Sequence, residues 1–284
     1  MLFVSFTSIF WAISSYAEKR TVRTGVSRRD FFFYSCLSLI PFAAIMLIFT
    51  QIFSNIFPVY FKPVYFIPSF WIIPILAGSV LLRYGKLTAI VSTVEKLVPY
   101  ESEAYMCLGI ILAYITDSVT GIKSFTYWGV LSILLAVAGV FLIADVKLQI
   151  KKLRINLIIR LVCDVGLGYI TRFALMFFSN SLYILILNAI IVLICFHRYK
   201  LSSYKENFPV IKLVLIQQFW GFICLFLGNI AAQQSVTAYA FIRPITLAFC
   251  VLTAFITKKE ERTPKIKDLG AVALIIGGIY LQTV

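Results

Sequence analysis

The chain has 284 residues, of which 61% are apolar and 13% are charged, with a formal net charge of +14. Soluble domains carry about 25% charged residues, so this composition and a mean hydropathy of +0.95 exclude an ordinary soluble protein. The basic residues lie in short segments beside apolar runs. Membrane topology therefore explains the positive charge better than nucleic-acid binding does.

Apolar runs recur along the whole chain, and each is long enough to cross about 30 Å of hydrocarbon. The runs are continuous instead of alternating, which favours helices over barrel strands. The expected fold class is an all-α integral membrane protein with ten transmembrane helices. The predicted spans are 2–18, 31–52, 65–82, 87–115, 126–146, 155–178, 180–197, 209–232, 234–257 and 268–283.

Charge in the predicted loops sets the orientation of these spans. Loops after odd-numbered spans hold 19 Lys and Arg residues, whereas loops after even-numbered spans hold only Lys62 and Lys123. Basic loops stay in the cytoplasm, so both termini are predicted outside, in a multi-pass protein of the cell (inner) membrane. Because five is an odd number, residues 1–150 and 151–284 form two inverted five-helix repeats, and together one transmembrane domain.

A faint internal repeat supports this division. Residues 83–142 and 228–281 each hold a hydroxyl-rich apolar run, a single proline, a second apolar stretch and a closing run that contains glycine. The two prolines, Pro99 and Pro244, are 145 residues apart. Inverted repeats indicate alternating-access transport, and helix breaks in such proteins lie at the substrate site.

Ionisable residues inside the spans mark the candidate substrate-binding site, because a charge in lipid needs a partner, water or a function. At about 1.5 Å per residue, Lys96, Asp164 and Arg243 lie near the midplane, and Glu95 adjoins Lys96. We expect these four residues to line a cavity beside the prolines. A structural salt-bridge set that locks the helices is the alternative interpretation.

The four predicted charges sum to zero, which suits a zwitterion or a polar neutral solute. Protonation of Glu95 or Asp164 would couple transport to a proton gradient. Further polar groups of the expected cavity wall are Ser92, Gln233 and Tyr239.

Other chemistry has little support in the sequence. The six cysteines show no paired or metal-ligand spacing, and His197 is the single histidine. There is no GxxxxGK[ST] motif for a nucleotide and no pairing of a nucleophile with a base. We therefore expect no metal, no cofactor and no enzyme activity.

The C-terminal block A-Q-Q-S-V-T-A-Y-A-F-I-R-P, followed by K-K-E-E-R and D-L-G-A-V-A-L-I-I-G-G-I-Y-L, resembles the EamA-type drug/metabolite transporter superfamily. The resemblance implies two five-helix repeats, transport activity, and a last span that can mediate a homodimer. The matching positions are Trp11, Lys19, Pro99, Gly139, Pro244, Glu260 or Glu261, Gly270, Gly277 and Gly278.

The expected function is secondary transport of a small polar or zwitterionic metabolite such as an amino acid, as a proton-coupled exporter or exchanger. A nucleotide-sugar or sugar-phosphate antiporter is an alternative, and it would need basic residues such as Arg83, Lys86 or Arg172 in the cavity. A non-transport membrane scaffold is the third interpretation.

Overall fold

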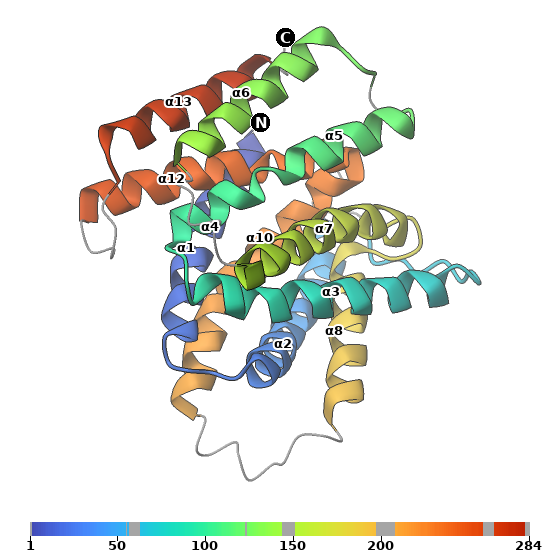
Figure 1. Cartoon of the computed structure of the whole chain (residues 1–284). Coiled ribbons are helices and arrows are strands. Elements are labelled where there is room, and N and C mark those ends of the chain that lie inside the picture. The colour runs from blue at the N-terminus through green and yellow to red at the C-terminus, as the bar shows by residue number, and fades with distance from the viewer. Residues whose placement is uncertain are drawn as a thin grey trace.

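The protein is helical throughout the residues that its computed structural model describes (Figure 1). These residues are 2–54, 56, 63–122, 124–143, 151–196, 208–257 and 264–281. Within them the only β-type pairing is an isolated bridge between Phe66 and Phe178, so the predicted all-α class is confirmed. The helices are α1 (Leu2–Val22), α2 (Arg28–Ser54), α3 (Ile72–Val94), α4 (Pro99–Met106), α5 (Gly109–Val119), α6 (Tyr127–Ile143), α7 (Lys151–Ala174), α8 (Asn180–Phe196), α10 (Phe208–Gln234), α11 (Val236–Ala240), α12 (Ile242–Thr257) and α13 (Ile266–Leu281).

Three of these helices, α2, α3 and α10, are long and apolar enough to cross a membrane. Helices α6, α8 and α12 are apolar but shorter. The helical class and these three helices are compatible with a membrane protein, while the count of ten spans stays a prediction. Lys62, Lys123, His197, Glu260 and Glu261, which entered the sequence argument, lie outside the described residues.

One predicted loop is absent, because α3 is continuous from Ile72 to Val94. Arg83 and Lys86, assigned to a loop by the sequence, therefore lie inside a helix. A Cβ at Gly85, which lies between them, would be 2.7 Å from the Cys163 sulfur of α7. This glycine allows close packing of two helices, and the chain turns later, at residues 95–98.

Helices from the two halves of the chain pair with each other. Helix α3 packs against α7, α1 against α10, α2 against α8, and α6 against α13. The last pair runs side by side at the top of Figure 1. Consequently residues 1–150 and 151–284 interleave, and one buried core cluster contains Tyr100 of the first half and Leu247 of the second.

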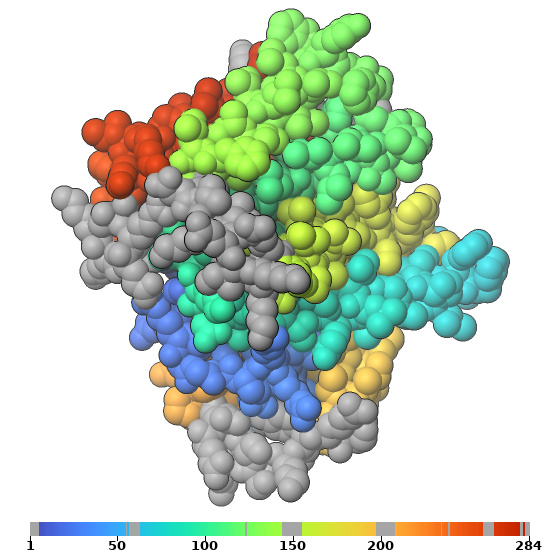
Figure 2. All heavy atoms as spheres, viewed as in Figure 1, coloured from blue at the N-terminus to red at the C-terminus, as the bar shows by residue number. Residues whose placement is uncertain are grey.

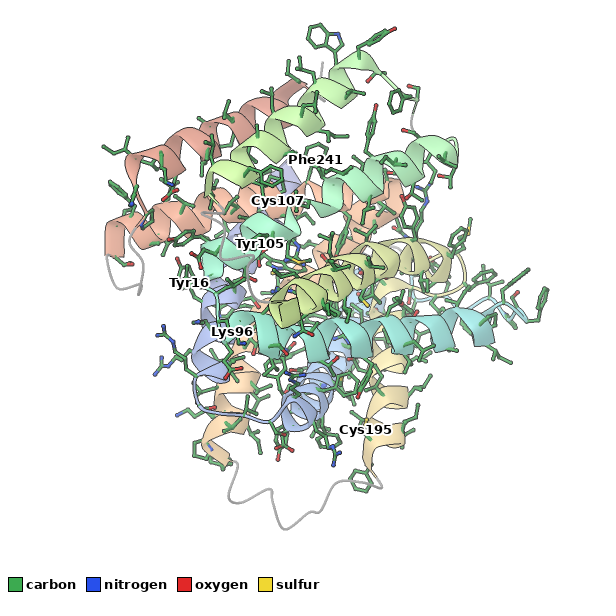
Figure 3. The ribbon with its side chains drawn as sticks, viewed as in Figure 1. Tyr16, Lys96, Tyr105, Cys107, Cys195 and Phe241 are labelled. Carbon is green, nitrogen blue, oxygen red and sulfur yellow. The ribbon has the colours of Figure 1, made fainter. Side chains whose placement is uncertain are left out.

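Two helical segments are broken and pack against each other. Cys107 and Leu108 separate α4 from α5, and Phe241 separates α11 from α12. Helix α4 packs against α12, and α5 packs against α11. Cys107 and Phe241, both labelled in Figure 3, belong to the same core cluster, so the breaks lie in the interior of the molecule.

The two prolines do not occupy matching places in these broken segments. Pro99 begins α4, before its break, whereas Pro244 is the third residue of α12, after its break. Proline is tolerated in the first turn of a helix, where its missing N–H has no intrahelical acceptor. Each proline therefore lies in the first turn of a helix that follows a break, at residues 95–98 before Pro99 and at Phe241 before Pro244.

Large apolar side chains are exposed on the surface, whereas several charged side chains are buried in the interior. Figure 2 shows the N-terminal end of α3 projecting from the body of the molecule, and Ile73 in this region is 77% exposed. Arg160, Asp164 and Arg243 are by contrast only 3%, 4% and 3% exposed. This distribution suits a protein that is surrounded by lipid.

Candidate functional site

A cluster of ion pairs lies where α3, α4, α7 and α12 meet. Asp164 of α7 accepts hydrogen bonds from Arg243 of α12, with Nη2 at 2.7 Å and Nε at 3.2 Å from Oδ2. Its other oxygen accepts one from Nζ of Lys86 on α3. Arg243 also donates from Nη1 to Glu103 Oε2 of α4 at 2.9 Å. A single guanidinium thus joins two buried carboxylates.

Two aromatic residues complete the surroundings of these charges. The Arg243 guanidinium lies 4.1 Å from the centroid of the Trp11 ring, and Lys86 Nζ lies 5.5 Å from it. Such cation–π contacts are worth about 2 kcal/mol or more when desolvated. The Tyr239 hydroxyl donates to Asp164 Oδ1 at 3.3 Å. Trp11, which the sequence indicated only as a match to the family pattern and not as a site residue, therefore contacts both cations.

Arg160 extends the cluster toward α1. It donates to the Ser102 hydroxyl at 2.6 Å and the Thr93 hydroxyl at 3.3 Å. Its Nη2 lies 3.8 Å from Glu103 and 3.9 Å from Glu18. We define the charged cluster as Lys86, Arg160, Arg243, Glu18, Glu103 and Asp164, whose formal charges sum to zero.

Two small cavities flank the charged cluster. One has a volume of about 80 Å³ and the other about 30 Å³, against about 30 Å³ per water molecule in the liquid. Arg83 and Lys86 line both cavities. The larger is also lined by Trp11, Ser14, Ser15, Glu18, Leu39, Leu87, Ile90, Arg160, Gln217, Gln218, Gly221, Cys224, Leu225 and Arg243. A metabolite larger than a few waters requires the helices to move apart.

A larger hollow of about 690 Å³ lies elsewhere, between α2, α3 and α8. Its wall is mostly apolar and includes Val80, Tyr84 and Ile191, with Arg28 and Arg29 at α2. The α3 residues that line this hollow lie on a different face of the helix from Arg83 and Lys86. None of the charged cluster lines it, so the small cavities are the better candidate site.

The structure brings together three of the predicted site residues: Asp164, Arg243 and Tyr239. Ser92 is buried, but its hydroxyl contacts none of the cluster and has no hydrogen-bond partner. Gln233 is exposed near the end of α10. Neither Ser92 nor Gln233 lines the two cavities.

Glu95 and Lys96 lie apart from the charged cluster, and neither lines the two small cavities. Both are exposed in the turn after α3, where Figure 3 labels Lys96. Their depth was counted along a single helix over 87–115, whereas α3 ends at Val94. Lys19 holds this turn, because its Nζ donates to the carbonyls of Val94 and Leu97 at 2.7 and 2.8 Å.

Sequence reasoning missed four members of the charged cluster, one of which, Glu18, did not enter the sequence argument at all. Lys86 was placed in a loop, Arg160 near a span end, and Glu103 away from the midplane. The signal for Glu103 was its position one turn after Pro99, on the same predicted face. Lys86 and Arg160 gave no such signal, because their partners Asp164 and Glu103 are 78 and 57 residues away in sequence.

Asp117 of α5 has a structural role that the sequence did not indicate. It is completely buried, and its Oδ2 accepts the backbone N–H and the hydroxyl of Thr237 at 2.7 and 2.6 Å. Its Oδ1 accepts the Tyr169 hydroxyl at 3.1 Å. Asp117 thus caps α11 from a neighbouring helix. Within the part of the chain that the structure describes, no three His, Cys, Asp or Glu residues are grouped to hold a metal ion.

Comparisons with known proteins match the fold but not the sequence. No protein-family model and no curated protein matches the chain. Among solved structures, a crystal structure of a protein aligns with a TM-score of 0.66 over 99% of this chain and 95% of its own, at 15% sequence identity. At this identity the likeness shows the fold alone.

Proposed function

We propose that this chain is a secondary transporter that moves a small polar metabolite, such as an amino acid, across the cell (inner) membrane by alternating access. The observation that carries this proposal is the set of buried ion pairs between the two halves. Lys86 and Glu103 of the first half pair with Asp164 and Arg243 of the second. Buried charges in lipid are rare and mark substrate or ion pathways.

The pairing of helices supports ten spans in two inverted repeats. Exchanging the halves maps the α3–α7 pair onto the α10–α1 pair, and maps α2–α8 and α6–α13 onto themselves. A pseudo-two-fold axis between repeats produces this pattern. In this proposal α4–α5 and α11–α12 each form one broken span, and the resemblance to the EamA-type superfamily points the same way.

Proton coupling follows from the same contacts. Motion of one half against the other must break the Lys86–Asp164 and Glu103–Arg243 pairs. Protonation of Asp164 removes the charge that holds both Lys86 and Arg243, so it favours separation of the halves. The exposed Glu95 has no part in this proposal.

A homodimer through the last spans would use only some of the glycines of α6 and α13. A Cβ at Gly278 would lie 2.7 Å from the Ser132 carbonyl, and one at Gly139 would lie 2.7 Å from the Ala271 carbonyl. These glycines serve the α6–α13 contact within the chain. Gly270 and Gly277 have no atom within 4 Å of a built Cβ, so a second copy has space there.

The test is solute counterflow in proteoliposomes made with the full chain. We expect uptake of at least one amino acid, stimulated by a proton gradient. Asp164→Asn should abolish it, whereas Lys96→Gln, outside the cluster, should retain it. Failure of every tested amino acid, amine, sugar and organic anion to exchange would contradict transport, whereas full activity of the Asp164→Asn variant would contradict the role of Asp164 in it.

A further inference from the structure

We propose that Arg83 binds an oxyanion, a carboxylate or phosphate group of the transported solute, where the two small cavities meet. The proposal rests on the proposed transport function of this site and names the chemical class of its substrate. It differs from the expectation of a neutral cluster with no preference for anions.

Arg83 is buried, and the part of the chain that the structure describes supplies no counter-ion for it. Its side chain is 9% exposed, and its Nε is buried with no hydrogen-bond partner. Among the described residues no carboxylate oxygen lies within 4.0 Å of its guanidinium, while such pairs exist for Lys86, Arg160 and Arg243. The thiol of Cys36 interacts with Arg83, but a thiol supplies no negative charge.

The charge balance leaves room for one anionic group. The six residues of the charged cluster neutralise one another, so Arg83 adds one uncompensated positive charge beside them. A buried charge without a partner is strongly unfavourable. A single carboxylate or phosphate would supply the missing charge, and a guanidinium can bind either with two parallel hydrogen bonds.

Arg83 also faces the space in which such a group would bind. Together with Lys86 it lines both cavities. Each cavity wall holds a buried amide oxygen without a hydrogen-bond partner: Gln217 Oε1 in the larger and Asn188 Oδ1 in the smaller. These oxygens can accept N–H or O–H groups, so the geometry suits a solute that carries donors beside its oxyanion.

An amino acid and a hydroxylated phosphate ester share this chemistry, and the experiment separates them. The thermal stability of the purified full chain is measured with L-alanine, glucose 6-phosphate, inorganic phosphate, glucose and putrescine. We expect stabilisation by L-alanine or by the two phosphates, and none by glucose or putrescine. Stabilisation by L-alanine assigns a carboxylate, and stabilisation by glucose 6-phosphate assigns a phosphate.

Three variants test the residue itself. Arg83→Gln should weaken binding of the stabilising probe by about tenfold or more, since it removes a charge-assisted bidentate contact. Arg83→Lys keeps the positive charge but cannot donate two parallel hydrogen bonds, so its affinity for the probe should be intermediate. This variant replaces Arg83→Gln in the test if Arg83→Gln does not fold. Arg172→Gln is the matched control, because this basic residue of α7 lines neither cavity and its loss should leave binding unchanged.

The proposal is overturned if no oxyanion stabilises the protein, or if Arg83→Gln and Arg83→Lys bind as tightly as the unchanged chain. Counterflow of glucose or putrescine that depends on Asp164 would also overturn it while leaving the transport function intact. If no solute exchanges but anion stabilisation still depends on Arg83, the transport function fails and the binding site stands.

Discussion

The two broken segments of the molecule, α4–α5 and α11–α12, share a plan but differ in chemistry. Each is a short helix, a break of one or two residues and a longer helix. The first carries the carboxylates Glu103 and Asp117, whereas the second carries the donors Thr237, Tyr239 and Arg243. The segments are alike in architecture and complementary in charge.

This difference explains how the segments hold each other. Glu103 of α4 accepts from Arg243 of α12 at 2.9 Å, and Asp117 of α5 caps α11 through Thr237 at 2.7 and 2.6 Å. Glu103 and Asp117 are thus each bonded by a donor of the other segment. Two identical segments could not do this, because like charges would face one another where the segments are in contact.

The largest expected effect on stability comes from Asp164→Asn, which weakens the ion pairs around Arg243. Asp164 bonds both Arg243 and Lys86, so the variant leaves buried cations undercompensated. Removing one partner of a buried pair costs about 3–5 kcal/mol. The measurement is the Tm of the protein in detergent. Asp30→Asn is the control, because Asp30 bonds Ser27 at an exposed helix start, and equal losses in both variants would refute the structural role of Asp164.

Changes to the contact between Asp117 and Thr237 should lower the stability by a smaller amount. Asp117→Asn weakens the cap of α11 and should cost about 1–2 kcal/mol. Thr237→Val removes only the hydroxyl donor and should cost about 1 kcal/mol. The double variant should lose less than the sum of the two, because both changes remove the same hydrogen bond. Additive losses in Tm would show that these groups do not interact.

The smallest effect is expected outside both contacts, at Lys96. Because Lys96 is exposed in the turn after α3, Lys96→Gln should leave Tm and counterflow unchanged within error. A loss of transport in this variant would show that the turn after α3 takes part in substrate binding. The neighbouring Lys19→Gln should lower Tm measurably, since Lys19 is buried and bonds the end of α3.

Particular residues show how far the sequence could predict the site. Counting depth along the chain selected Asp164 and Arg243, which the structure buries and pairs with each other. The same count also selected Glu95 and Lys96, which the structure places in the exposed turn after α3, because the count assumed one continuous helix over 87–115. Glu103 could not be assigned, since its partner Arg243 is 140 residues away and a single sequence carries no record of that contact.

The amino-acid sequence by itself determined the helical class and the burial of charge in apolar segments, because hydropathy and run length are local properties. Only the tertiary structure decided which charges neutralise each other, where the helices break, and that Arg83 has no carboxylate within 4.0 Å among the described residues. Those features depend on contacts between segments from opposite halves of the chain. Arg83 illustrates the difference: in the sequence it is one of many basic residues, and in the fold it is buried in the wall of two cavities.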